Sequence, residues 1–148
     1  MNIVQMKRSN YADVYSLWIN TPGMGLNNID DSKKGIRKYL KRNPKTCFIA
    51  KDGKRIVGVI LSGHDGRRGY IHHTAVDIQY RNQGIGRELV NKAIEALREE
   101  GINKVAFVVF KNNEIGNKFW ERLGFNIRED LIYRNKVISD LEIQRIDT

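Results

Sequence analysis

The sequence predicts an α+β domain of the mixed three-layer type, in which helices cover both faces of one central sheet. Two observations support this class. Segments with the apolar spacing of amphipathic helices are interleaved with short runs rich in β-branched residues, and glycine-containing turns separate them. The 148 residues suffice for one domain with a buried core, and the sequence contains no linker, repeat or low-complexity segment. We therefore expect residues 1–148 to form a single domain.

The first half of the chain is expected to supply a strand, two helices and three further strands. Ser9 is the expected cap of the first helix, and Val14 and Trp18 belong to its inward stripe. Asp52 and Gly53 predict a tight hairpin, because this dipeptide tolerates positive φ. The expected ranges are 2–6 for the first strand, 9–20 and 32–42 for the helices, and 46–51, 55–63 and 70–76 for the later strands.

The second half is expected to contain two helices and the remaining strands. Gly101 and Gly124 each follow a helical pattern and would end it. Asn113 is a suitable cap for the second of these helices. The expected ranges are 84–100 and 113–123 for the helices, 104–110 for a buried strand, and 125–138 for a segment that alternates enough to form strands.

The formal charge of +9 has two interpretations. A basic protein can attract nucleic acid or a phosphorylated ligand, and lysines can also simply solvate helix surfaces. In the helix 32–42 the basic residues share one side and the apolar residues the other, which favours solvation. No basic-aromatic stripe or nucleic-acid motif accompanies the charge, so we expect no nucleic-acid partner.

The sequence also indicates a compartment. Cys47 is the single cysteine and lies in an apolar run, so we expect a buried, inert thiol. The N-terminus lacks the apolar region of a signal peptide, and no apolar run approaches the roughly 20 residues that a membrane crossing needs. We expect a cytoplasmic protein with no membrane partner.

The stretch "YRNQGIGRELV" places two glycines where a strand gives way to a helix. The first turn of a helix leaves about four backbone N–H groups without partners, and these donors with the helix dipole form an anion site. Gly84 and Gly86 have no Cβ, so a phosphate could approach closely, and Arg81 and Arg87 add positive charge. The stretch fits neither a Walker A loop, which needs Gly-Lys-Ser/Thr, nor a dinucleotide fingerprint, because position 89 is Leu.

Two longer stretches resemble a known family. "AVDIQYRNQGIGREL" resembles the acyl-CoA-binding signature of the GNAT superfamily of N-acetyltransferases, and "NNEIGNKFWERLGF" resembles its second signature. The resemblance implies the GNAT-like acyl-CoA N-acyltransferase fold, whose central, mostly antiparallel sheet splays open. It further implies acetyl-CoA as the acyl donor and no metal. The residues that it implies for cofactor binding are Thr74, Ala75, Val76, Arg81, Asn82, Gln83, Gly84, Ile85, Gly86, Arg87 and Asn113, with Trp120 shaping the pocket.

Two positions depart from the family's catalytic pattern. Val108 stands where some members have a Glu base, and Trp120 stands where many have a Tyr that protonates the departing thiolate. An indole N–H donates a hydrogen bond but is no useful acid, and packing in the core explains Trp120 equally well.

The strand 70–76 and a later tyrosine offer substitutes for the missing catalytic groups. His72 has an unperturbed pKa near neutrality that suits a base, and a structural role weighs about the same. Strand alternation predicts Tyr70, His72 and Thr74 on one face and His73 on the other, where we expect a structural histidine. Tyr70 is a candidate relay, and Tyr133 is a candidate acid.

The leading hypothesis is an N-acetyltransferase that moves the acetyl group of acetyl-CoA directly onto a primary amine of a small-molecule or peptide acceptor. The alternative is a CoA-binding module of the same fold with weak or no catalysis. The loop 21–28 is expected to line the acceptor entrance, and Asp30 and Asp31 follow it. These carboxylates could hold a cationic amine, and helix capping explains Asp31 equally well. The sequence leaves the oligomeric state open, a homodimer included.

Overall fold

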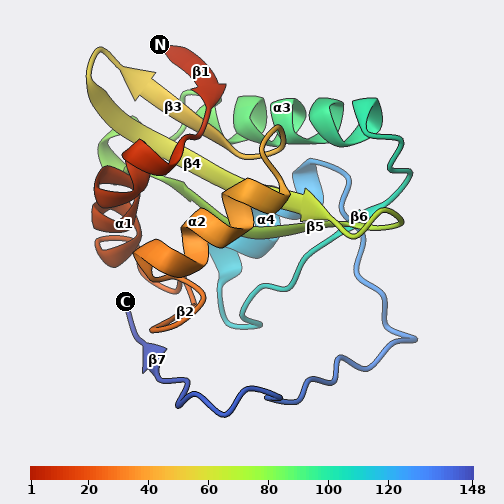
Figure 1. The fold of residues 1–148 in the computed structure, drawn as a ribbon. Helices are drawn as coiled ribbons and strands as arrows, with labels where there is room; N and C mark the ends of the chain where they lie inside the picture. Colours follow the sequence, from red (N-terminus) through yellow and green to blue (C-terminus); the bar gives the residue numbers. More distant parts are fainter.

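A computed structural model describes residues 1–148 and contains a five-stranded sheet in the order β1-β3-β4-β5-β6 (Figure 1). Neighbouring strands are antiparallel except β5 and β6, which are parallel. A separate two-stranded ribbon joins β2 to β7. The strands are β1 (Asn2–Gln5), β2 (Leu26–Asn27), β3 (Phe48–Asp52), β4 (Arg55–His64), β5 (Gly69–Val76), β6 (Val105–Ala106) and β7 (Arg145–Ile146).

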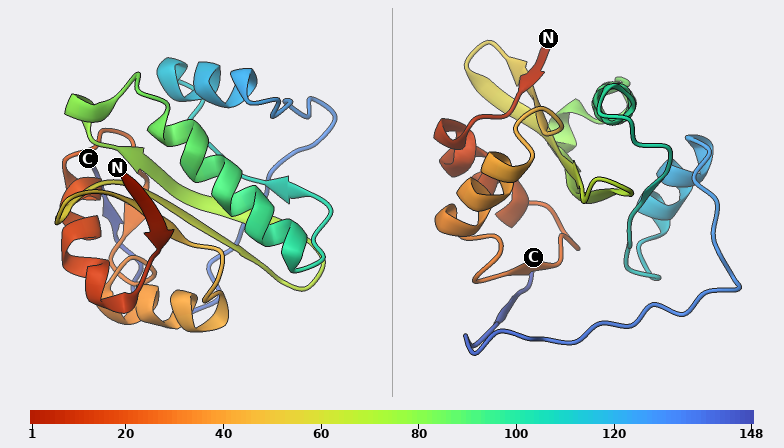
Figure 2. Two further views of the ribbon diagram at one scale, coloured as in Figure 1. Left: turned by 90° about the horizontal axis from the view of Figure 1, so that it is seen from above. Right: turned by 45° about the vertical axis from the view of Figure 1, so that its right-hand side comes forward.

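Helices cover both faces of the sheet, so the expected three-layer α+β class is confirmed (Figure 2). Helices α1 and α2 bury Trp18 and Ile36 in one core cluster, and α3 and α4 bury Leu89 and Trp120 in the other. The helices are α1 (Tyr11–Ile19), α2 (Lys33–Arg42), α3 (Ile85–Glu99) and α4 (Glu114–Arg122), with short 3-10 turns at Arg8–Asn10 and Ile78–Tyr80. None of them combines the length and the apolar content that a membrane crossing requires.

Of two predictions made for a hairpin and a helix end in the first half of the chain, one is confirmed and one is wrong. The hairpin at Asp52 is confirmed, with Gly53 at φ 61°. The expected cap Ser9 is wrong, because a 3-10 turn precedes α1 and Asn10 is the residue at its N-terminus. Ser32 does cap α2, where its hydroxyl oxygen accepts a hydrogen bond from the Gly35 N–H at 3.0 Å.

The predicted late strands are largely absent. The strand expected over 104–110 is reduced to Val105–Ala106, and the segment 125–138 contains no strand. A strand forms only where a neighbouring strand offers free backbone groups to pair with. Because β6 ends at Ala106, residues 107–110 offer the segment 125–138 no strand to pair with. The chain instead runs along the outside of the molecule (Figure 1) until Arg145–Ile146 pair with β2. Apolar side chains of this segment therefore lie exposed, among them those of Ile127, Leu131, Ile132, Val137 and Ile138.

The one thiol is buried, as expected, in the core cluster that α1 and α2 cover. Cys47 is 1% exposed, and its sulfur lies 3.3 Å from the carbonyl oxygen of Ser62. Burial raises the pKa of the Cys47 thiol to about 12, so the nucleophilic thiolate is scarce at neutral pH.

Helix α2 rests on the backbone of the loop that precedes it. A Cβ at Gly35 would overlap the carbonyl oxygens of Ile29 and Asp30. The absence of a side chain at this position therefore sets how closely α2 approaches the loop.

Replacing Gly35 by alanine should lower the free energy of unfolding by about 1–3 kcal/mol, the usual cost of overpacking. Intrinsic propensity acts in the opposite direction, because alanine is the better helix former by about 1 kcal/mol. Urea denaturation measures the difference. Lys38→Ala, on the exposed side of the same helix, is the control and should change stability by less than about 0.5 kcal/mol. A Gly35→Ala protein more stable than the parent would contradict this close approach.

Candidate active site

Strand β5 has one edge that is mostly unpaired. On one side it pairs with β4 from Gly69 to Val76, whereas on the other it pairs with β6 only at Gly69 and Tyr70. From Ile71 onward no strand covers that second edge, so the splayed sheet that the family resemblance implied is present (Figure 2). Backbone N–H and C=O groups on such an edge can bind an extended ligand as an added strand.

A loop with left-handed backbone connects this edge to α3. Asn82 has φ 63° and Gly84, the residue at the N-terminus of α3, has φ 81°. A Cβ at Gly84 would meet no atom within 4 Å, so space lies beside the first free amides of the helix. The Arg81 Nε donates a hydrogen bond to the Val76 carbonyl oxygen at 3.2 Å, which ties the loop to the end of β5. This geometry fits an anion at the helix N-terminus.

The remaining loop residues differ in their exposure. Asn82, Gln83 and Arg87 have exposed side chains, whereas the side chain of Ile85 is buried against the sheet. Ile85 can therefore offer a ligand only its backbone N–H and C=O groups.

Gly86 has a packing role that the sequence did not indicate. Its missing Cβ would lie 3.0 Å from two ring carbons of Phe119 on α4. We expected this glycine to make room for a phosphate, but the space where its side chain would lie is next to the Phe119 ring. Its small size sets the approach of α4 to α3.

The second signature lies on α4. Asn113 caps this helix as expected, because its side-chain oxygen accepts a hydrogen bond from the Gly116 N–H at 2.9 Å. Trp120 is 9% exposed and its ring centroid lies 4.3 Å from that of Phe107 and 5.2 Å from that of Phe125. These contacts agree with the core interpretation of Trp120.

A register shift in β5 overturns the predicted alternation of its side chains. Ile60 of β4 lies opposite Thr74, but Ser62, two residues further, lies opposite Ile71, three residues back. One extra residue is therefore accommodated in β5, as in a β-bulge. His72 and His73 consequently both face α1 and α2, although we expected them on opposite faces.

Aromatic side chains from two helices contact this pair of histidines. The ring of Tyr39 on α2 lies 5.3 Å from that of His72, and the ring of Trp18 on α1 lies 5.0 Å from that of His73. Tyr70 completes the group, with its ring 4.7 Å from that of His72.

His72 keeps an exposed edge while its ring is partly removed from water. This removal lowers the pKa of His72, and the neighbouring His73 lowers it further. The carboxylates of Asp31 and Asp30 oppose the shift because they favour the imidazolium. At neutral pH the ring is therefore mostly neutral, which is the form that accepts a proton.

The two tyrosines proposed for catalysis lie near one another. Burial, and then the nearby Tyr133, raise the pKa of Tyr70, while a backbone hydrogen bond from Val108 acts in the opposite direction. Tyr133 belongs to the irregular segment and is 65% exposed. The structure thus brings Tyr70 and His72 together, with Tyr133 at the solvent side.

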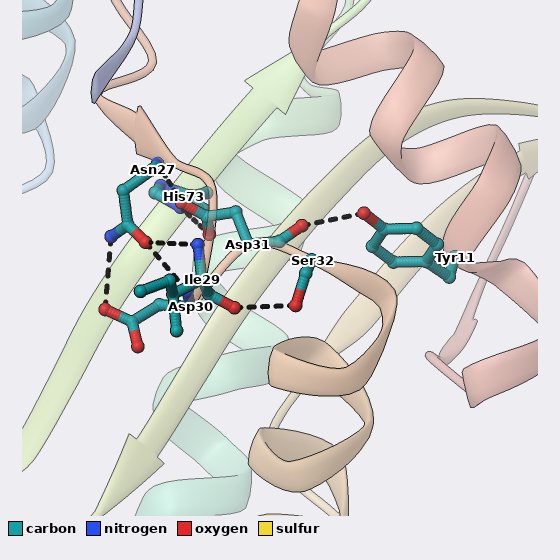
Figure 3. A network of polar contacts seen from close by, with 7 residues as sticks. All are labelled: Tyr11, Asn27, Ile29, Asp30, Asp31, Ser32 and His73. Atoms are coloured by element: carbon teal, nitrogen blue, oxygen red, sulfur yellow. Dashed lines mark hydrogen bonds and ion pairs between the residues drawn. The ribbon is translucent and has the colours of Figure 1, made fainter. Parts of the chain in front are cut away.

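Asp31 has a partner that sequence reasoning missed. Its Oδ1 lies 2.6 Å from Nε2 of His73, and its Oδ2 accepts a hydrogen bond from the Asn27 N–H at 2.8 Å (Figure 3). It does not cap α2, because Ser32 does. The partners His73 and Asp31 are 42 residues apart, so no local pattern could have revealed the pair.

No group of three or more His, Cys, Asp or Glu side chains lies close enough to hold a metal ion. Two surface hollows, of about 290 and 420 Å³, contain no residue of β5. Their linings are mostly polar and charged and lie beside α1 and beside the outer face of α3. The candidate site is the open edge of β5 with the loop that follows it, because both present free backbone groups to a ligand.

Comparison with known proteins shows the family to which the chain belongs. The sequence model of the acetyltransferase (GNAT) family matches residues 11–125. The chain belongs to this family. Its match includes β5, the loop at Gly84 and α4, which are the elements that form the candidate site.

Two relatives illustrate the range of similarity. The chain is 38% identical over 103 residues to N-alpha-acetyltransferase 30 of Xenopus laevis. This match covers 66% of this chain and 37% of the relative. The chain thus matches little more than a third of that relative's length. It is 26% identical over 148 residues to acetyltransferase plu1384 of Photorhabdus laumondii, covering 96% of this chain and 99% of the relative.

Solved structures share the fold. A chain of the NatC complex bound to Gag peptide and CoA matches with a TM-score of 0.70 and 26% identity, over 85% of this chain and 86% of the other. Ard1 from Thermoplasma volcanium matches with a TM-score of 0.69 and 19% identity, over 86% and 83% of the two chains.

Gly86→Ala should destabilise the protein by about 1 kcal/mol despite the gain in helix propensity, because its Cβ would press on Phe119. Phe119→Leu, which removes ring carbons, should relieve this contact. A double-mutant cycle measured by thermal unfolding should therefore give a double variant less destabilised than the sum of the single changes. Strictly additive effects would contradict the proposed packing.

Proposed function

We propose that the protein is an acetyl-CoA-dependent N-acetyltransferase that acts on the α-amino group of a peptide or protein. The observation that carries the proposal is the continuity of two ligand-binding features on one stretch of chain. The edge of β5 loses its strand partner at Ile71, and six residues later the chain enters the open loop that starts α3. A long ligand with an amide-bearing arm and a diphosphate matches both features in that order.

The pantetheine arm and the diphosphate of acetyl-CoA would be held by backbone groups. Thr74 and Val76 direct theirs to the unpaired edge, where the pantetheine arm would be an added strand, whereas Ala75 between them directs its own toward Val59 of β4. The amides from Asn82 to Arg87 would bind the diphosphate with the positive end of the helix dipole. Arg81 contributes its charge beside this loop while its Nε bonds to Val76.

His72 is the proposed base. It would take a proton from the acceptor ammonium, and the resulting amine nitrogen would attack the thioester carbonyl carbon. The C–S bond then breaks, the thiolate sulfur ends protonated as coenzyme A, and the second proton passes to solvent. At pH 7 about one α-amine in ten is neutral, compared with about one lysine amine in 2500. A weak base such as a histidine of lowered pKa therefore suits an α-amine better than a lysine.

No strong acid is needed for the leaving group. A thiol of pKa about 8.5 departs tolerably as the anion, and Trp120 is packed in the aromatic cluster of α4. Tyr133, near Tyr70 at the solvent side, remains the proposed donor to the departing sulfur. Asn113 would contact the cofactor from the side of α4.

The relatives support the choice of acceptor. One is named as an N-alpha-acetyltransferase, and one structure of similar fold is described with a peptide and CoA. An aminoglycoside 6'-N-acetyltransferase also shares the fold at 17% identity, so fold alone does not select the acceptor. The direct test incubates the protein with acetyl-CoA and a panel of peptides with free N-termini, lysine-bearing peptides with blocked N-termini, and small amines. Mass spectrometry should detect acetylation of free N-termini first.

A CoA-binding module without catalysis is the second candidate. It is favoured by Val108 and Trp120, which stand where a catalytic Glu and Tyr are found in relatives of the family. This candidate would be preferred if CoA raised the melting temperature while no amine in the panel were acetylated.

Gly84→Val should weaken CoA binding by about tenfold or more, equivalent to about 1.4 kcal/mol. A valine at φ 81° is strained and its side chain would project into the space beside the loop amides. Gly53→Val is the matched control, because Gly53 has φ 61° with open space around it and lies in the β3–β4 hairpin. Both variants should lose about 1–2 kcal/mol of stability, but calorimetry should find reduced CoA affinity only for Gly84→Val. Equal affinities would remove the loop from the binding site.

His72→Ala should remove the acidic limb of the pH profile and lower kcat by roughly 10²–10⁴-fold. In the parent protein the rate falls as the pH drops through the lowered pKa of His72, because the protonated ring cannot accept a proton. The measurement is kcat against pH with a peptide from the panel. His64→Ala, which changes a histidine at the end of β4, should keep the limb. An unaltered profile in His72→Ala would exclude this residue as the base.

A further inference from the structure

A buried carboxylate links the loop before α2 to the bulged strand. Asp31 is 4% exposed, and the side chain of His73, with which it pairs, is 13% exposed. The Oδ1–Nε2 distance of 2.6 Å is that of a strong, charge-assisted hydrogen bond. The other carboxylate oxygen accepts the Asn27 N–H, and the Asp31 carbonyl accepts the Tyr11 hydroxyl at 2.7 Å (Figure 3). Both ends of this residue are therefore fixed.

Stability alone is a weak reason for such a pair. A buried pair of polar side chains often contributes no more than an apolar pair of the same size. Helix capping does not need Asp31 either, because Ser32 performs it. The position of the pair in the fold is informative, since it joins the loop 26–31 to β5.

The pair acts on His72 from two sides. On β5, His73 is the next residue, and both belong to the stretch where the register shifts. On α2, whose cap Ser32 directly follows Asp31, Tyr39 packs its ring against the ring of His72. Anchoring Asp31 thus fixes the strand that carries His72 and the start of the helix that covers it.

We propose that Asp31 and His73 form a positioning pair that clamps the loop 26–31 and α2 onto the bulge of β5, and so orients His72 toward the acceptor amine. This inference rests on the proposed function. His73 does not contact the substrate, because its Nε2 is occupied by Asp31 and its ring is covered by Trp18.

The pair also has an electrostatic effect on His72. The titratable groups around the His72 ring are Tyr39 on α2, Tyr70 and His73 on β5, and the carboxylates Asp30 and Asp31 of the loop. Of the two carboxylates, Asp31 does more to raise the pKa of His72 against the effect of desolvation. Removing its charge should therefore lower the pKa of His72 further.

The first test needs no acceptor. Asp31→Asn keeps the size and the hydrogen-bonding oxygen but removes the charge. The chain has three histidines, so NMR can follow each ring through a pH titration in the free protein. The titration of His72 should move to lower pH in Asp31→Asn. Glu100→Gln is the matched control, because Glu100 is the carboxylate of the other His–acid pair, 4.0 Å from His64, and it should leave His72 unchanged. An unshifted His72 in Asp31→Asn overturns the proposal.

The second test measures acetyl transfer to a peptide that the parent protein modifies. Asp31→Asn should lose roughly 10–100-fold in kcat/KM for the peptide, the range typical when the partner that orients a functional histidine is removed. The acidic limb of kcat should move to lower pH. The rise in melting temperature caused by CoA should be the same as in the parent protein, because the loop at Gly84 is untouched. A parent-like kcat/KM with a parent-like acidic limb overturns the proposal.

A pair of His73 variants decides the matter if Asp31→Asn does not fold. His73→Gln keeps a side-chain N–H that can reach Asp31, whereas His73→Ala has none. The first should retain most of the peptide activity and the second should lose it, with equal protection by CoA. Equal activities of the two variants would contradict the proposed positioning role of the Asp31–His73 pair. If the parent protein binds CoA but modifies no peptide, the proposed function fails, while the NMR titration still tests the pair.

Discussion

The two-residue contact between β5 and β6 is the constraint on which the site depends. Buried backbone groups need hydrogen-bond partners, and β5 has a strand on both sides only at Gly69 and Tyr70. Beyond that point one edge must find its partners in water or in a ligand. The same strand leads through Arg81 into the N-terminus of α3, so a single piece of chain carries both the free edge and the free helix amides. Neither the free edge nor the helix N-terminus could shift without a shift of β5.

The bulge in β5 is the second determinant of the site. Regular pleating sends successive side chains to opposite faces, so adjacent histidines would be separated by the sheet. The extra residue opposite β4 brings His72 and His73 to the face of α1 and α2. One histidine can then face solvent while its neighbour is held by Asp31. The different surroundings of the two rings therefore follow from the bulge in β5.

Sequence reasoning succeeded where the signal was local and failed where pairing was distant. The Asp52–Gly53 hairpin, the Asn113 cap and the helix that starts after Gly84 were each encoded by a few adjacent residues, and all are present. The late strands were predicted from alternation alone, but a strand exists only if an edge accepts it, and 107–110 provide none. The register shift of β5 and the partner of Asp31 depend on residues far along the chain. The loop at Gly84 and the helix that follows it were therefore predictable, whereas the surroundings of His72 were not.

The burial of Cys47 has a practical consequence. Its sulfur is shielded in the core cluster that α1 and α2 cover, and a pKa of about 12 leaves it almost entirely protonated in ordinary buffers. A disulfide reagent that reports free sulfhydryls by colour would find none reactive on the folded chain, because this cysteine is the only one. Any colour that develops in a turnover mixture can be attributed to small-molecule sulfhydryl, and a late rise in colour would instead report unfolding.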